Sequence, residues 1–278
     1  MAITAADVKA LRERTGLPMM ECKKALSETN GDSEAAVDWL RQRGQAVAEK
    51  RADRETAFGR FGIFCGVDET AGAMVELKCE SAPVTQHDEF IQLANDLAEA
   101  LAKNADVVGD VDKLLALDCP SQAGKTLGDV KDDMFNRIRE VFNVGRMDRF
   151  DGPTCGYSHN SSTVAGVLLS VDGGNNEVGR DISMHVAAMN PSSLSVEELD
   201  SEVVDAERKV LTDQALAEGK PANIVDKMVE GRMKNFYAEK VLLEQTFVKA
   251  ENKETVGKFA ADNGMTVKGF AHHVLGEV

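Results

Sequence analysis

The sequence has few cysteines, and none of them lie close together. The five cysteines are widely spaced and odd in number, and the chain has no CxxC pair and no Cys/His cluster. Structural zinc sites need clustered ligands, and small disulfide frameworks need an even set of cysteines. The sequence therefore predicts neither a zinc site nor a disulfide, and we expect the thiols to pack as small apolar groups.

Long apolar runs are also missing. No run approaches the ~20 residues that a helix needs to cross a bilayer. The first ten residues, MAITAADVKA, have neither the apolar core of a signal peptide nor the Arg-rich character of an organellar transit peptide. We therefore expect no membrane association and a cytoplasmic location.

Sequence motifs of enzymes are equally scarce. The chain contains no GxSxG and no HExxH. The segment Ala123–Thr126, AGKT, resembles the end of a phosphate-binding loop, but Cys119 stands where that motif needs glycine. The sequence therefore predicts no catalytic residue, no metal and no cofactor, and indicates a protein that makes or breaks no bond.

The charge is strongly acidic, with 47 Asp and Glu against 32 Lys and Arg and a net charge of −15. Residues 1–55 are balanced in charge, so the excess lies in the rest of the chain. An acidic body repels phosphate backbones, which predicts no nucleic-acid binding. The same charge suits a protein partner with a basic surface, although solubility explains it equally well.

Residues 4–44 read as three short helices. Thr4 and Asp7 have the spacing of a capping box, Thr15–Pro18 breaks the chain, and a third helix ends near Gly44. A bundle this small has little core, so we expect Trp39 to supply a large share of it. The charged segment 46–56 follows as a helical or flexible connector.

From residue 58 the apolar pattern alternates between strand and helix periods. Strands are predicted at 60–67, 74–79, near 141–150, at 163–171 and at 265–274. Helices are predicted from Asp88, near 129–140, at 181–189 and around 255–261. Strand pairs interleaved with helices indicate an α+β core.

Residues 190–246 read as a projecting antiparallel helical hairpin. Gly219 ends one helix, and Pro221 begins the next after a very short connection. Apolar residues recur along both helices at coiled-coil spacing. The predicted seam comprises Leu199, Val203, Ala206 and Val210 in the first helix, and Val225, Val229, Met233, Tyr237 and Val241 in the second. Such an arm is suited to holding a partner.

Four blocks of sequence resemble the elongation factor Ts family, and they fall in the family's order. They are LRERTGLPMMECKKAL (Leu11–Leu26), VELKCESAPVTQHDEFIQLA (Val75–Ala94), Gly156–His159, and the arm sequence from Gly219 to Val248, which follows MHVAAMNPSSLS, a predicted helix from Met184 to Ser195. The resemblance therefore runs from the first helix to about residue 275.

This resemblance implies a guanine-nucleotide exchange factor that binds elongation factor Tu in its GDP form and promotes GDP release. It implies a ubiquitin-associated-like three-helix domain with its connector at 1–55, a core N-subdomain at 56–145, and a core C-subdomain at 146–278 carrying the inserted hairpin. It also implies a homodimer through the core or the arm as a further expectation.

The resemblance also implies which residues meet the partner. The implied contacts are Thr15, Gly16, Leu17, Pro18, Met19, Met20, Lys23 and Lys24 against the outer helix of the G domain, Ser81, Ala82, Pro83 and Val84 on the magnesium side, and His159 against a distal domain. Three departures from the family lie at or beside these contacts. Leu17-Pro18 replace small residues, and Ser81–Val84 replace the family's Thr-Asp-Phe-Val. Asn160-Ser161-Ser162 replace the family's glycine- and arginine-containing turn after the histidine.

Two other interpretations remain open at this point. A three-helix domain of this type can serve an adaptor that binds a ribosomal or ubiquitin-like partner without nucleotide exchange. An enzyme with an acidic active site is the second alternative.

Overall fold

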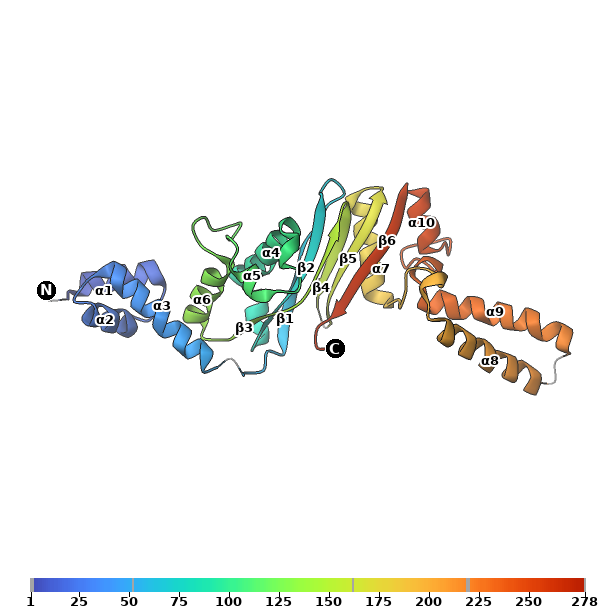
Figure 1. The fold of residues 1–278 in the computed structure, drawn as a ribbon, viewed down its shortest axis with the longest axis horizontal. Helices are drawn as coiled ribbons and strands as arrows, with labels where there is room; N and C mark the ends of the chain where they lie inside the picture. Colours follow the sequence, from blue (N-terminus) through green and yellow to red (C-terminus); the bar gives the residue numbers. More distant parts are fainter. Residues whose placement is uncertain (1–2, 52, 162, 219–220, 278) are drawn as a thin grey trace. The chain divides into compact units, whose positions relative to one another are not determined.

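A computed structural model describes residues 3–51, 53–161, 163–218 and 221–277 (Figure 1). The chain forms two compact units: the first holds residues up to Gly62 and Val75–Met147, and the second holds Ile63–Met74 and Asp148–Glu277. Both contain helices and strands, which confirms the predicted α+β class. Among the described residues, no helix is both long and apolar enough to cross a membrane.

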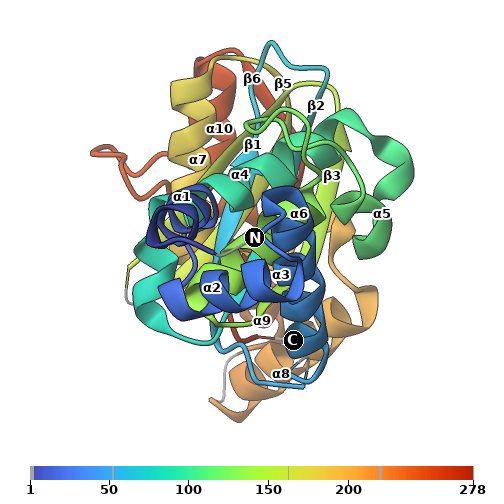
Figure 2. The ribbon, with the colours of Figure 1, turned by 90° about the vertical axis from the view of Figure 1, so that its left-hand side faces the viewer.

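The first unit begins with a three-helix bundle, whose helices lie together in Figure 2. Its helices are α1 (Ala5–Thr15), α2 (Met19–Glu28) and α3 (Ser33–Glu49). The predicted capping box is present, with the Asp7 N–H donating to the Thr4 hydroxyl. The core contains Val8, Leu11, Leu17, Cys22, Ala25, Leu26, Ala36 and Leu40. Trp39 is only partly buried and packs against this cluster, so the expectation that it would form much of the core was wrong. Several small apolar side chains fill the space instead.

A three-stranded sheet follows, with its strands in the order β1-β2-β3. The strands are β1 (Phe58–Phe64), β2 (Ala71–Cys79) and β3 (Phe142–Asp151). The connecting helices are η1 (Ala82–Gln86), α4 (Asp88–Lys103), η2 (Ala105–Val107), α5 (Val111–Leu115) and α6 (Leu127–Ile138). The α4 stripe Phe90, Leu93, Leu97 and Leu101 is buried, as its spacing predicts. Gly62 lies so close to α4 that a Cβ atom would stand 1.8 Å from the Ala94 oxygen.

The second unit contains an antiparallel sheet in the order β4-β5-β6. Its elements are β4 (Thr154–Asn160), β5 (Val164–Gly173), α7 (Asn176–Met189), α10 (Val256–Asp262) and β6 (Met265–Val274). Residues Val167, Leu169 and Val171 on one face of β5 share a core with Ile182 of α7. The short helix expected at 181–189 is present and ends at Met189, although α7 begins earlier, at Asn176. The prediction of a helix from Met184 on to Ser195 was wrong, because Asn190 adopts the left-handed conformation (φ 46°) and Pro191 follows.

Two helices of the second unit, α8 (Ser201–Ala217) and α9 (Ala222–Lys240), lie side by side as a hairpin (Figure 1). The short helices η3 (Val196–Glu198) and η4 (Leu242–Glu244) flank it. The predicted α9 stripe is correct in its buried members, which pack with α8 as a cluster of Leu211, Ala215, Val225, Val229 and Met233.

The predicted α8 seam was wrong by one residue. Val203 and Val210 are 51% and 48% exposed, whereas Leu211 is buried and Val204 packs against the hairpin core. The pairs Val203-Val204 and Val210-Leu211 present two adjacent apolar stripes of equal spacing. Packing against α9 selects the second stripe, and the sequence pattern alone does not distinguish them.

Candidate partner-binding site

The loop between α1 and α2 presents an exposed apolar pair beside two lysines. Gly16 ends α1 in the left-handed conformation (φ 69°), and Pro18 directly precedes α2. The first residues of α2, Met19 and Met20, are 45% and 73% exposed. Lys23 and Lys24, one turn later, are also exposed. Flexible methionine side chains on a rigid helix start suit contact with another protein.

Leu17, by contrast, is part of the bundle core and only 5% exposed. Its N–H donates to the Thr15 hydroxyl at 3.4 Å, and its carbonyl accepts from the Cys22 thiol at 3.6 Å. The Thr15 hydroxyl in turn donates to the Leu11 carbonyl at 2.8 Å. Leu17 and Thr15 therefore hold the loop in place, and the methionines form its accessible surface.

The Ser81–Val84 segment forms a short crest whose middle is exposed. Ser81 precedes η1, Ala82 and Pro83 are exposed, and Val84 is buried. The Thr85 hydroxyl donates to the Ala82 carbonyl at 2.8 Å, which closes the turn. The crest therefore offers a small apolar surface on a fixed backbone.

His159 lies on β4 in the second unit and is partly exposed. Its Nδ1 is 3.0 Å from the Tyr157 hydroxyl on the same face of the strand, and the ring centroids are 5.9 Å apart. Ala165 is its register partner on β5. These neighbours fix the orientation of the imidazole at the sheet surface.

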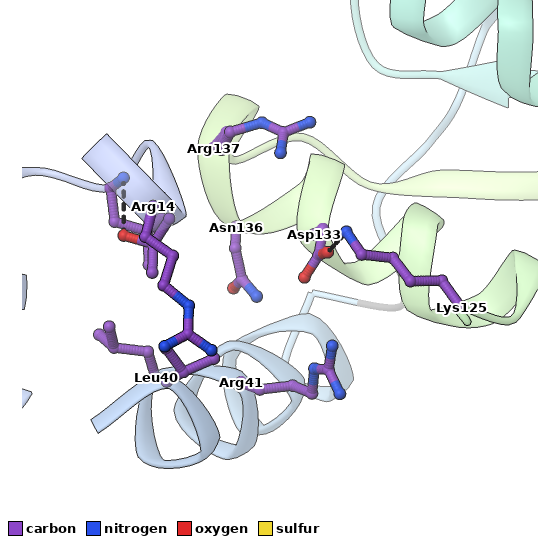
Figure 3. A pocket seen from close by; sticks show the side chains of 10 residues that line it. Arg14, Leu40, Arg41, Lys125, Asp133, Asn136 and Arg137 are labelled. Atoms are coloured by element: carbon purple, nitrogen blue, oxygen red, sulfur yellow. Dashed lines mark hydrogen bonds and ion pairs between the residues drawn. The ribbon is translucent and has the colours of Figure 1, made fainter. Parts of the chain in front are cut away.

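A cavity of about 260 Å³ lies between the bundle and α6 within the first unit (Figure 3). Its walls include Arg14, Leu40, Arg41, Lys125, Asp133, Asn136 and Arg137. Every one of the four cations pairs with a carboxylate: Arg14 with Glu34, Arg41 with Asp129, Lys125 with Asp133, and Arg137 with Glu89. Each cation of the wall has a carboxylate partner, and one of these partners, Asp133, lies in the wall itself, so the cavity is a polar joint between two layers.

Three of the cysteine thiols are unsuited to nucleophilic chemistry. Burial raises the pKa of Cys65 and of Cys155 to about 11. Burial, together with the negative charge of Glu140, raises the pKa of Cys79 to about 12. These thiols stay protonated at neutral pH. Across the described part of the chain, no group of three or more His, Cys, Asp or Glu residues is placed to hold a metal ion.

Each sequence-predicted contact thus has a defined place. The bundle loop and the Ser81–Val84 crest both belong to the first unit, whereas His159 belongs to the second. Sequence reasoning missed two contacts at the first two surfaces: the Ser81 N–H donates to Glu140 Oε2 at 3.0 Å, and Arg139 Nη2 lies 2.5 Å from Glu21 Oε2. The partners in these contacts are 59 and 118 residues apart in the chain.

Comparison with known proteins identifies the relatives of this chain. The family model described as "Elongation factor TS" matches residues 83–277. Elongation factor Ts of Methylococcus capsulatus is 44% identical over 281 residues, spanning 100% of this chain and 93% of the relative. The proteins of the same name from Halothermothrix orenii and Ruegeria pomeroyi are 38% and 42% identical, spanning 100% of this chain and 93% and 94% of their own lengths.

Proposed function

The chain belongs to the elongation factor Ts family and is a guanine-nucleotide exchange factor for elongation factor Tu, and we propose that it engages this GTPase through the three surfaces described above. The function is inferred from the sequence similarity to elongation factor Ts, which extends along the whole chain. The interpretation of residues 1–55 as part of an adaptor without exchange activity lacks support from these relatives.

The bundle loop is the proposed anchor on the G domain. Met19 and Met20 supply exposed apolar area, and Lys23 and Lys24 supply positive charge one turn further along α2. Apolar side chains at the centre of a contact contribute affinity, and rim charges mainly guide association. Residues 1–55 would then act as one binding domain, supported by their separate core.

The Ser81–Val84 crest is proposed to act on the magnesium side of the nucleotide site. The exposed Ala82 and Pro83 are the residues that can enter a neighbouring surface, because Val84 is turned into the core. Proline offers a small rigid surface where the family has phenylalanine. Its loss of contact area relative to a phenylalanine corresponds to up to ~2 kcal/mol at ~25 cal/mol per Å2. Exchange would therefore depend more on the other two surfaces.

His159 and strand β4 are proposed to face a distal domain of elongation factor Tu. The imidazole is partly exposed and held by Tyr157, so it can form a directed contact. The core would then consist of an N-subdomain at 56–145 and a C-subdomain at 146–278. The hairpin α8–α9, with Val203 and Val210 exposed, offers surface for a homodimer or a further partner contact.

Exchange by such a factor follows from thermodynamic linkage. An exchange factor of this kind binds the nucleotide-free GTPase best. It lowers the affinity of the GTPase for GDP by the same ratio by which bound GDP lowers the affinity of the GTPase for the exchange factor. No covalent step is needed, and the family's role is exchange without bond-making chemistry. We place this activity in the cytoplasm, with a protein partner and without nucleic acid.

The test is the release of a fluorescent GDP analogue from elongation factor Tu, with and without this protein. Sub-stoichiometric amounts should accelerate release over several turnovers. Deletion of residues 1–50 should raise the concentration of factor needed for half of the maximal rate. Equal binding of the truncated and full chains would remove the bundle from the proposed interface.

A further inference from the structure

The turn between α6 and β3 contains two residues that reach in different directions. Arg139 caps α6 in the left-handed conformation (φ 68°), and its N–H donates to the Phe135 carbonyl at 2.7 Å. Positive φ is uncommon for a residue other than glycine. Arg139 therefore occupies a backbone position where glycine would be less strained.

The next residue, Glu140, binds the beginning of the Ser81–Val84 crest with both carboxylate oxygens. The Ser81 N–H donates to Oε2 at 3.0 Å, and the Ser81 hydroxyl donates to Oε1 at 2.6 Å. The Cys79 thiol donates to the Ser81 carbonyl at 3.3 Å. Ser81 thus has its amide, its hydroxyl and its carbonyl engaged. Hydrogen bonds to a carboxylate are stronger than those between neutral groups.

The far end of the crest is also attached to the body of the first unit. Val84 is buried, and the Arg60 guanidinium donates to the Thr85 carbonyl at 3.2 Å. Ala82 and Pro83 lie between these two attachments and are exposed. Their position is therefore set by what holds Ser81 on one side and Val84 on the other.

Arg139 binds the N-terminal bundle. Its Nη2 lies 2.5 Å from Oε2 of Glu21, and each side chain of this pair is about one third exposed. Glu21 directly follows Met20 in α2. The Arg139 carbonyl also accepts from Arg51, which lies just beyond α3, at 2.9 Å. The same turn therefore contacts the bundle at two points.

From these contacts we propose that the Arg139-Glu140 turn is a positioning element that sets both proposed partner-contacting surfaces of the first unit. Glu140 fixes the crest through Ser81, and Arg139 fixes the methionine-bearing helix α2 through Glu21. Neither residue needs to touch the GTPase. This inference rests on the proposed role of the crest and the bundle loop, and it adds the residues that orient them.

The two halves of the turn have different kinetic signatures. The crest acts on the nucleotide site, so loss of the Glu140–Ser81 contact lowers the maximal rate of GDP release. The bundle supplies affinity, so loss of the Arg139–Glu21 pair raises the half-saturating concentration of factor and leaves the maximal rate in place. A turn that only stabilised the fold would lower the fraction of folded factor, which raises the apparent half-saturating concentration in both cases and lowers the maximal rate in neither. The concentrations are therefore corrected for the folded fraction measured by circular dichroism.

The crest arm of the experiment uses Ser81→Ala and Glu140→Gln in the full-length protein. Each is expected to lower the maximal rate by about threefold, because it frees the whole crest and does not merely shorten one side chain; a threefold change corresponds to ~0.7 kcal/mol. The double variant should be no slower than the slower single variant, because both changes remove the same contact. Ser81→Thr, which keeps a hydroxyl, should recover most of the rate lost in Ser81→Ala.

The bundle arm uses Glu21→Gln and Arg139→Gln. Each is expected to raise the half-saturating concentration by about fivefold, as for a partly exposed ion pair with good geometry, and the double variant should add little. Glu99→Gln removes the ion pair with Lys103 on α4 and is the matched control. Faster amide hydrogen exchange at Ser81 in Glu140→Gln provides a readout that needs no partner.

The outcomes separate this inference from the function itself. If the unaltered protein did not accelerate GDP release, the proposed function would fail, and amide exchange at Ser81 would still decide whether Glu140 fixes the crest. If the unaltered protein were active and all four variants matched Glu99→Gln, the positioning role would be refuted. Independent, multiplying effects of Ser81→Ala and Glu140→Gln would refute it as well. If Glu140→Gln lost its fold by circular dichroism, Ser81→Ala and its recovery in Ser81→Thr would decide the question.

Discussion

Replacing Gly44 by alanine should destabilise the protein, although helix propensity predicts the opposite. Gly44 lies inside α3 and is buried. Alanine in a helix interior is normally more stable than glycine by ~0.5–1 kcal/mol. Here, however, a Cβ atom would lie 1.8 Å from the Asn136 Oδ1 and 2.5 Å from its Cγ on α6. Asn136 is itself 6% exposed and lines the cavity between the bundle and α6, so relief of this clash would need its side chain to turn into that cavity.

The magnitude follows from these two opposing terms. Forcing one extra carbon into a packed contact typically costs ~1–3 kcal/mol. After the gain in helix propensity is subtracted, Gly44→Ala should lower the free energy of unfolding by ~0–2.5 kcal/mol, with ~1 kcal/mol as the central value. Gly231 in α9 is the matched control, because nothing lies within 4 Å of a Cβ added there. Gly231→Ala should therefore raise stability by ~0.5–1 kcal/mol.

Urea unfolding followed by circular dichroism measures both changes. The double variant Gly44→Ala/Asn136→Ala should regain most of the stability lost in Gly44→Ala, since the clashing atoms are gone. Gly44→Ala should also raise the half-saturating concentration in the exchange assay, because α3 can no longer pack closely on α6. A Gly44→Ala protein as stable as Gly231→Ala would refute the reasoning about this contact.

Three further predictions concern the crest, the hairpin and a buried histidine. Pro83→Ala should change the GDP-release rate by less than about twofold, whereas His159→Ala should slow it by about fivefold or more, on the scale of one lost hydrogen bond. Stopped-flow kinetics measure both rates, and a larger loss in Pro83→Ala than in His159→Ala would contradict this prediction. Met233→Ala, at a fully buried site in the hairpin core, should cost ~2–4 kcal/mol in urea unfolding, and a cost near zero would mean that the hairpin core is not packed as described. Burial lowers the pKa of His185, and a hydrogen bond to Gln245 opposes this shift. As the pH falls through about 6.5, His185 of the unfolded chain therefore binds a proton, whereas His185 of the folded protein stays neutral to lower pH. Stability is therefore complete above about pH 6.5 and falls as pH drops below it, by up to ~1.4 kcal/mol per pH unit; His185→Gln should flatten this dependence, and an unchanged slope would assign it to other groups.

The elements that could be predicted from the sequence are those whose signals are local. The capping box at Thr4 and the apolar stripe of α4 depend on residues three or four apart, and both are present. The stripe of α9 was predicted correctly for the same reason, whereas α8 offers two stripes one residue apart, and only contact with α9 decides between them.

Less of the candidate site could be predicted from the sequence. Leu17 was expected to meet the partner, but it lies in the bundle core, so its substitution would report on folding of the bundle. The contacts of Arg139 and Glu140 could not be predicted, because their partners Glu21 and Ser81 are 118 and 59 residues away in the chain. No periodicity or local motif connects positions at such separations.

The most direct test of the central claim is the rate of fluorescent GDP release from elongation factor Tu at sub-stoichiometric concentrations of this protein. The exchange function predicts that release accelerates in proportion to the added protein, over many turnovers, and that the protein alone hydrolyses no nucleotide. A release rate unchanged by a molar excess of the folded protein would contradict the account.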